Sequence, residues 1–238
     1  MNSTRTYRRA SLALTGLIAV FSALVVFALA GGHDAAAHER GEHEAATSST
    51  RVSTPAPVSL EELALRNDMR RLWEDHVTWT RLAIISLTTD APDTQATVGR
   101  LLRNQTDIGD AIKPFYGEAA GQELTRLLRD HILIAADLIA AARAGDEAAL
   151  GDAQSRWTTN ADEIAAFLAS ANPRSWTVDE MRAMLHEHLR LTTNEAVARL
   201  QGDWAADVAA YDAIHLHALE MADKLSTGIV EQFPRRFH

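Results

Sequence analysis

The strongest constraint on the fold of this 238-residue chain is a helical periodicity that begins at Leu60 and continues almost to the C-terminus. Apolar residues recur there at intervals of three and four, which places them on one face of an α-helix. No segment has a convincing strand pattern. The periodicity is interrupted by typical helix breakers at Ala91-Pro92, Lys113-Pro114, Gly145, Asn172-Pro173 and Gly202. The sequence therefore predicts an all-α helical bundle of about six helices.

A motif ending in histidine recurs at intervals of about 56 residues in this region. Its three copies are MRRLWEDH ending at His76, LTRLLRDH ending at His131 and MRAMLHEH ending at His188. A helix break follows each histidine by 14 positions, and a second helical segment follows each break. This register predicts that the bundle is built as three helical hairpins.

The second segment of each hairpin carries a polar residue followed three positions later by an acid. The polar residues are Asn104, Asn160 and His217, and the acids are Asp107, Glu163 and Glu220. Positions i, i+3, i+4 and i+7 share one face of a helix. On this basis the three motif histidines face the core, the acids lie at the edge of the apolar stripe, and His186 points outward.

Buried polar groups cost about 1–3 kcal/mol each when they have no partner, which leaves two interpretations open. In the first, the polar set is a packing network that fixes the register between similar helices. In the second, the set binds Zn, Fe, Mn or Cu, because imidazole and carboxylate groups without thiolates suit these metals. The candidate metal-site residues are His76, His131, His188, Asp107, Glu163, Glu220 and His217.

No established metal motif is present. His186-Glu187-His188 lacks the histidine pair at i and i+4 of the H-E-x-x-H helix, and no helix carries the Glu-x-x-His pattern of di-iron bundles. Glu195 is a single acid on the His188 face that could complete a site. The tryptophans Trp73, Trp79 and Trp157 are interpreted as core residues.

Composition narrows the classes of function. The chain contains no cysteine, which excludes disulfides, thiolate catalysis and cysteine-bound metals. Its formal charge of −9 argues against a general nucleic-acid binder, which needs a basic face. Apolar residues make up 47% of the chain but aromatic residues only 6%, a composition that favours close-packed helices.

The N-terminal region predicts export from the cytoplasm. Arg5, Arg8 and Arg9 precede an uncharged run over residues 12–30, and Ala28-Leu29-Ala30 offers a cleavage site. Residues 1–30 are therefore a cleaved signal peptide or a membrane anchor. Residues 31–58 lack apolar periodicity and are expected to be a disordered linker. Residues 59–236 form the helical domain, placed outside the cytoplasm or secreted.

Residues 66–236 resemble a group of small, uncharacterised all-helical bacterial proteins. The resembling segments are LWEDHVTWTRLAIIS, RLLRN, NADEIAAFL, EAVARL, AADVAAYD and GIVEQFP. Members of that group are sometimes described as glycosyltransferases or acetylglutamate kinases. This chain has no alternating strand and helix pattern, no D-x-D on a strand and no glycine-rich phosphate loop. The resemblance therefore implies a fold and no activity.

Three functions are compatible with these observations. The first is a cell-envelope binding module, with a divalent metal bound by core histidines and carboxylates. The second is a structural or interaction module, in which the same residues only specify packing. An enzyme that uses a histidine and a carboxylate is the third and would need an open cleft, which closely packed helices do not provide.

Overall fold

The computed structural model describes residues 58–237, and within that range the regular structure is entirely helical. The elements in chain order are α2 (Leu60–Thr89), α3 (Thr94–Tyr116), α4 (Glu118–Ala144), α5 (Glu147–Ala171), α6 (Val178–Gln201), α7 (Trp204–Gln232) and the short 3-10 helix η2 (Pro234–Arg236). The all-α bundle of six helices is confirmed. The predicted export segment and linker lie outside the described residues.

The helices begin and end where the local sequence favours it. Ser59, Asp146 and Asp203 each accept a hydrogen bond from a backbone N–H in the first turn that follows, and Thr177 forms a capping box with Glu180. Three helices end on a residue in the left-handed conformation, with φ of 56°, 67° and 72° at Asp90, Gly145 and Gly202. These are the three breaks that follow the histidine motifs.

The break expected at Lys113-Pro114 is displaced. Helix α3 continues through Pro114 to Tyr116, and the chain turns at Gly117 with a φ of 87°. Proline removes one backbone donor and strains the helix, but Pro114 lies in its last turn, where little helix remains to be disrupted. The positive φ at Gly117, which favours glycine, marks the actual boundary.

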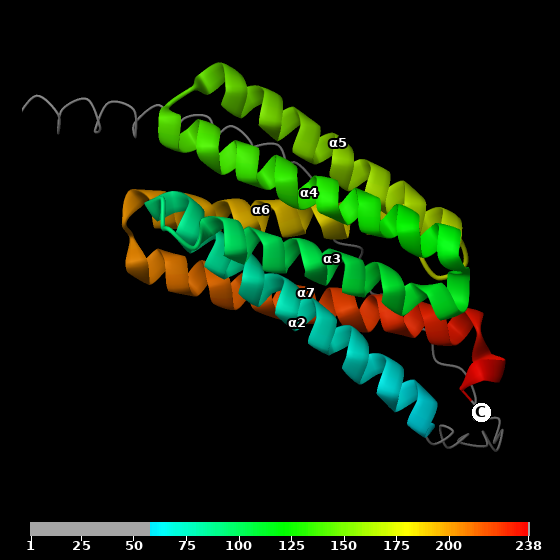
Figure 1. Cartoon of the computed structure of the whole chain (residues 1–238). Helices are drawn as coiled ribbons and strands as arrows, with labels where there is room; N and C mark the ends of the chain where they lie inside the picture. The colour runs from blue at the N-terminus through cyan, green and yellow to red at the C-terminus, as the bar shows by residue number, and fades with distance from the viewer. Residues whose placement is uncertain (1–57, 238) are drawn as a thin grey trace, which may run out of the picture. The chain divides into compact units, whose positions relative to one another are not determined.

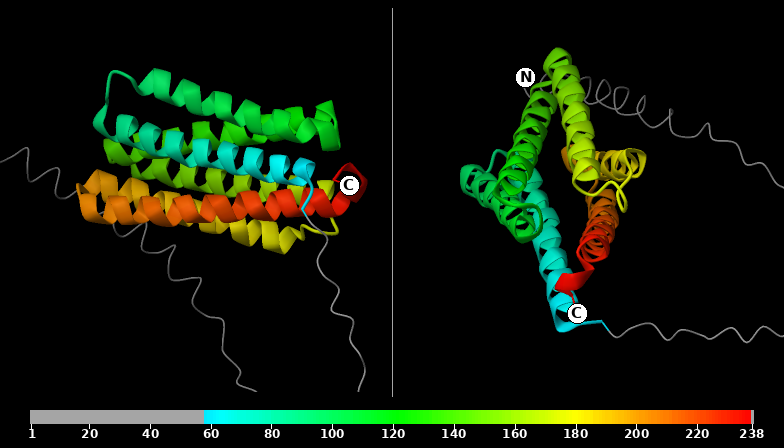
Figure 2. Two further views of the ribbon diagram at one scale, coloured as in Figure 1. Left: turned by 90° about the horizontal axis from the view of Figure 1, so that it is seen from below. Right: turned by 90° about the vertical axis from the view of Figure 1, so that its right-hand side faces the viewer.

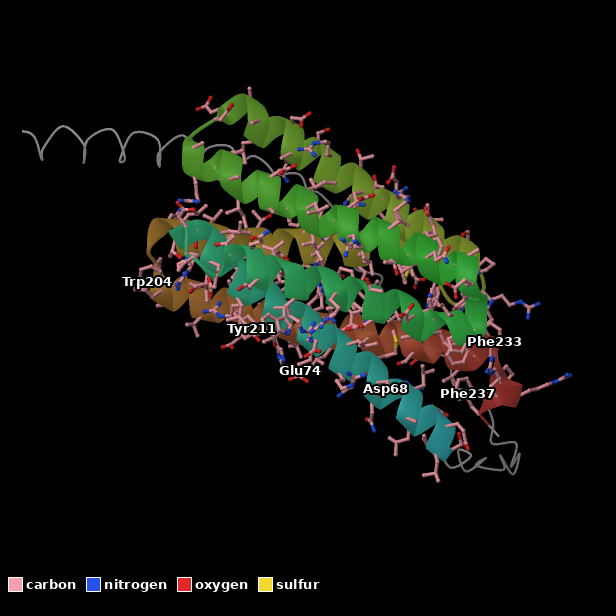
Figure 3. The ribbon with its side chains drawn as sticks, in the orientation of Figure 1. Asp68, Glu74, Trp204, Tyr211, Phe233 and Phe237 are labelled. Atoms are coloured by element: carbon pink, nitrogen blue, oxygen red, sulfur yellow. The ribbon has the colours of Figure 1, made fainter. Side chains whose placement is uncertain are left out.

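The six helices lie side by side and form a closed ring, in which each packs against the next and α7 packs against α2 (Figures 1 and 2). Helix α2 also contacts α4 and α6 across the ring. Helices near the two ends of the described range, α2 and α7, therefore share one core. Trp204 and Phe233 lie at opposite ends of α7, which shows how far that helix extends along the bundle (Figure 3). Among residues 58–237 no helix is long and apolar enough to span a membrane.

Candidate metal centre

Three histidines from three helices meet inside the ring. His76 on α2, His131 on α4 and His188 on α6 are 3%, 5% and 4% exposed. The ring centre of His188 lies 5.6 Å from that of His76 and 6.0 Å from that of His131. The helical periodicity correctly placed all three in the core. Their meeting point follows from the contacts of α2 with α4 and α6, with His188 between the other two rings.

A hydrogen bond fixes the protonation pattern of His131. Its Nδ1 lies 2.8 Å from Asn160 Oδ1, and Asn160 Nδ2 donates to the carbonyl of Leu127 at 3.1 Å. Because this second bond orients the amide, Asn160 Oδ1 accepts and His131 Nδ1 carries the hydrogen. His131 Nε2 is left with a lone pair, to which no side chain in residues 58–237 donates.

The other two histidines are less constrained. Gln105 Nε2 lies 3.3 Å from His76 Nδ1, but it also lies 2.9 Å from the Leu101 carbonyl and 3.1 Å from Asn104 Oδ1. Two closer acceptors occupy both hydrogens of that amide, so either nitrogen of His76 is free to carry its proton. His188 Nδ1 is buried and has no hydrogen-bond partner among the described residues.

The inward-facing residues of α3, α5 and α7 anchor these helices by equivalent hydrogen bonds. Each donates to the carbonyl of the residue four positions before the motif histidine, at 3.0–3.1 Å. The pairs are Asn104 with Leu72, Asn160 with Leu127 and His217 with Met184. The three bonds hold α3 on α2, α5 on α4 and α7 on α6 in the same register.

The candidate acids do not join the histidines. Asp107, Glu163 and Glu220 are all exposed, although the sequence analysis placed them at the edge of the core. Only Glu220 approaches a candidate histidine, with its Oε2 4.0 Å from His217 Nδ1. A residue at i+3 lies about 60° off the face of residue i, and on α3, α5 and α7 that offset is enough to reach solvent.

His217 lies at the margin of the cluster. Its ring centre is 6.2 Å from that of His188, and its side chain is 13% exposed. His186 points outward as expected and lies 2.9 Å from Asp162. As placed, no three His, Asp or Glu side chains in residues 58–237 are grouped so that they could hold a metal ion.

Burial keeps the central imidazoles neutral. Desolvation lowers the pKa of both His76 and His131 from 6.5 to about 4, and it lowers the pKa of His188 well below its ordinary value. Two tryptophan rings flank the cluster, Trp73 at 5.5 Å from His76 and Trp157 at 5.2 Å from His131. Neutral imidazoles in an apolar surrounding are available as metal ligands without first losing a proton.

A second buried polar cluster joins α2, α6 and α7. Arg81 donates to Glu195 at 2.8 Å and to Asp207 at 3.0 Å, and Arg199 donates to Asp207 at 3.1 Å. Burial raises the pKa of Glu195 to about 7, although the hydrogen bond from Arg81 opposes this shift. Of this cluster the sequence analysis identified only Glu195, because nothing in the local pattern links residues on three helices.

No protein-family model, curated protein or solved structure matches the chain. The resemblance to small helical bacterial proteins therefore stays a prediction. The histidine centre has to be interpreted from its own geometry.

Proposed function

We propose that this chain is an extracytoplasmic helical module, tethered to the membrane or secreted, that binds a transition-metal ion at the centre formed by His76, His131 and His188. The observation that carries the proposal is the meeting of three buried, neutral imidazoles from three helices. Their ring centres are 5.6 Å and 6.0 Å apart for the two pairs that contain His188.

The hydrogen-bond pattern is suited to metal binding. A histidine that binds a metal through one ring nitrogen usually donates the N–H of the other to an acceptor that orients the ring. The Nδ1–H of His131 donates to Asn160 in this way. The unpartnered Nδ1 of His188 supplies another candidate ligand. Two imidazoles on one tetrahedral ion have ring centres about 5 Å apart, since metal–nitrogen bonds are about 2 Å long. Shifts of about 1 Å would bring these rings into range.

The membrane-tethered or secreted location rests on the basic residues and uncharged run before residue 31. The interpretation as three repeated hairpins rests on the sequence register. The three equivalent hydrogen bonds from side chains to backbone carbonyls support it. Neither proposal requires catalysis, and no catalytic residue is assigned.

A structural or interaction module is the second candidate. The amides of Asn104 and Asn160 hold pairs of helices together through buried hydrogen bonds, and such bonds specify packing without any ligand. On this interpretation each histidine stabilises the bundle by its contacts alone.

Metal analysis of the untagged full-length chain distinguishes the two candidates. A metal ion present at 100 times its dissociation constant stabilises the folded state by about 2.7 kcal/mol. Stabilisation of this size gives a measurable rise in Tm. The proposal expects Zn, Cu, Fe or Mn to produce such a rise, and His188→Gln to abolish it. His186→Gln is the matched control, since it removes an outward-facing histidine two residues away. If no metal is bound and no metal raises Tm, the histidines form only a packing network.

A further inference from the structure

We infer that the histidine centre takes a soft monovalent cation of the Cu(I) type, held between two imidazoles with His188 as the shared ligand. This inference rests on the proposed metal-binding function and specifies the ion. It differs from the divalent metal that the sequence pattern first suggested.

The spacing of the rings favours two-coordinate binding. With metal–nitrogen bonds of about 2 Å and about 1 Å from nitrogen to ring centre, two imidazoles on opposite sides of one ion have centres about 6 Å apart. The observed separations from His188 are 5.6 Å to His76, 6.0 Å to His131 and 6.2 Å to His217. The separations to His131 and His217 are closer to the linear value than to the tetrahedral one, and the separation to His76 lies between the two. Linear coordination is common for the d10 monovalent ions Cu(I) and Ag(I), whereas Zn²⁺ is nearly always tetrahedral in structural sites.

Two-coordinate binding does not need a three-ligand group, and the His, Asp and Glu side chains of residues 58–237 form none. His188 is adjacent to each of the other rings, so it can pair with His76 or His131 without all three nitrogens converging on one point. Two-coordinate binding requires only that one nitrogen lone pair on each of two imidazoles points at the ion. This needs smaller side-chain movements than bringing four ligands into a tetrahedral arrangement.

The charge of the surroundings also favours a monovalent ion. The solvation free energy of an ion grows with the square of its charge, so burying a divalent ion costs about four times as much as burying a monovalent one of equal size. Carboxylate ligands offset part of that cost in many divalent sites. Here Asp107 and Glu163 are exposed, and the two carboxylates buried in the described part of the chain, Glu195 and Asp207, are bonded to Arg81.

The test is a titration of the untagged full-length chain at pH 7 with Ag(I), in competition with Zn(II). Ag(I) is the probe because it shares the charge and linear preference of Cu(I) and needs no reductant. The variants are His188→Gln and, as the matched control, His186→Gln. Because both variants retain His33, His38 and His43 of the N-terminal segment, binding by those residues is common to them and cancels in the comparison.

The expected result is one Ag(I) held at least about tenfold more tightly than Zn(II), lost in His188→Gln and kept in His186→Gln. If His188→Gln does not fold, the imidazole ¹⁵N signals of the wild-type chain supply the readout, and Ag(I) should shift those of His188 and one neighbour. Zn(II) binding at the same histidines as tightly as Ag(I) would overturn the inference but leave the proposed function standing. Failure of every metal to perturb the core histidines would overturn both.

Discussion

Acidification should unfold the metal-free protein in a pH range set by its buried histidines. In the folded state the pKa of His76 and of His131 is about 4, against 6.5 for an ordinary histidine. Between these two values the unfolded chain binds more protons than the folded one, so the free energy of unfolding falls as the pH falls. The stabilising contribution is complete above pH 6.5 and is lost by about pH 4.

The size of the effect follows from these pKa values. At about 1.4 kcal/mol for each pH unit, the change from 6.5 to about 4 corresponds to about 3 kcal/mol for each histidine. Two such contributions are comparable with the whole stability of an ordinary domain, about 5–15 kcal/mol. Glu195 acts in the opposite direction, because its raised pKa of about 7 makes the folded state bind a proton more tightly. His188, whose pKa burial also lowers, adds to the loss, so Glu195 offsets only part of the contribution of the three histidines.

The assay is urea unfolding followed by circular dichroism at a series of pH values between 7 and 4. His131→Gln isolates one contribution, since glutamine can still donate to Asn160 but does not titrate. In that variant the loss of unfolding free energy over this range should shrink by about 3 kcal/mol relative to wild type. A loss equally large in the variant, or a stability of the wild-type chain that does not fall with pH, would refute the argument.

Two further substitutions test the packing of the bundle. Gly228→Ala would drive a methyl group into the indole of Trp176 and should cost about 1–3 kcal/mol in denaturant unfolding. Gly151→Ala, which meets nothing within 4 Å, should be neutral or stabilise by up to about 1 kcal/mol; equal effects of the two would contradict this. Glu195→Ala leaves Arg81 paired with Asp207 alone and should lower stability by about 1–3 kcal/mol. Glu195→Gln keeps an acceptor for Arg81 and should cost less. A melting temperature of Glu195→Gln no higher than that of Glu195→Ala would contradict this.

The architecture could be read from the sequence because its signals are local. The spacing of apolar residues, the left-handed caps at Gly145 and Gly202 and the capping residue Ser59 each act within one or two turns. The helix boundary expected at Pro114 was wrong because it rested on one such local signal. Proline disfavours a helix but does not forbid its last turn, and the conformation of Gly117 decided where α3 ends.

The candidate site was only partly predictable. The apolar stripes identified His76, His131 and His188 as inward-facing, since a residue's face follows from helical geometry. The exposure of Asp107 and Glu163 depends on how α3 and α5 are rotated about their axes against the neighbouring helices. The apolar stripe of a helix does not determine that rotation. Arg81 and Asp207 find their partners across helices, so no sequence spacing marks them.

The central claim is that the three core histidines bind a metal ion, and a crystal structure of the full-length chain soaked in Ag(I) tests it most directly. The account predicts an anomalous-scattering peak about 2 Å from a ring nitrogen of His188, with a second imidazole from His76 or His131 on its other side. Peaks confined to half-buried histidines at the surface such as His186 and His215, with none at His188, would contradict it.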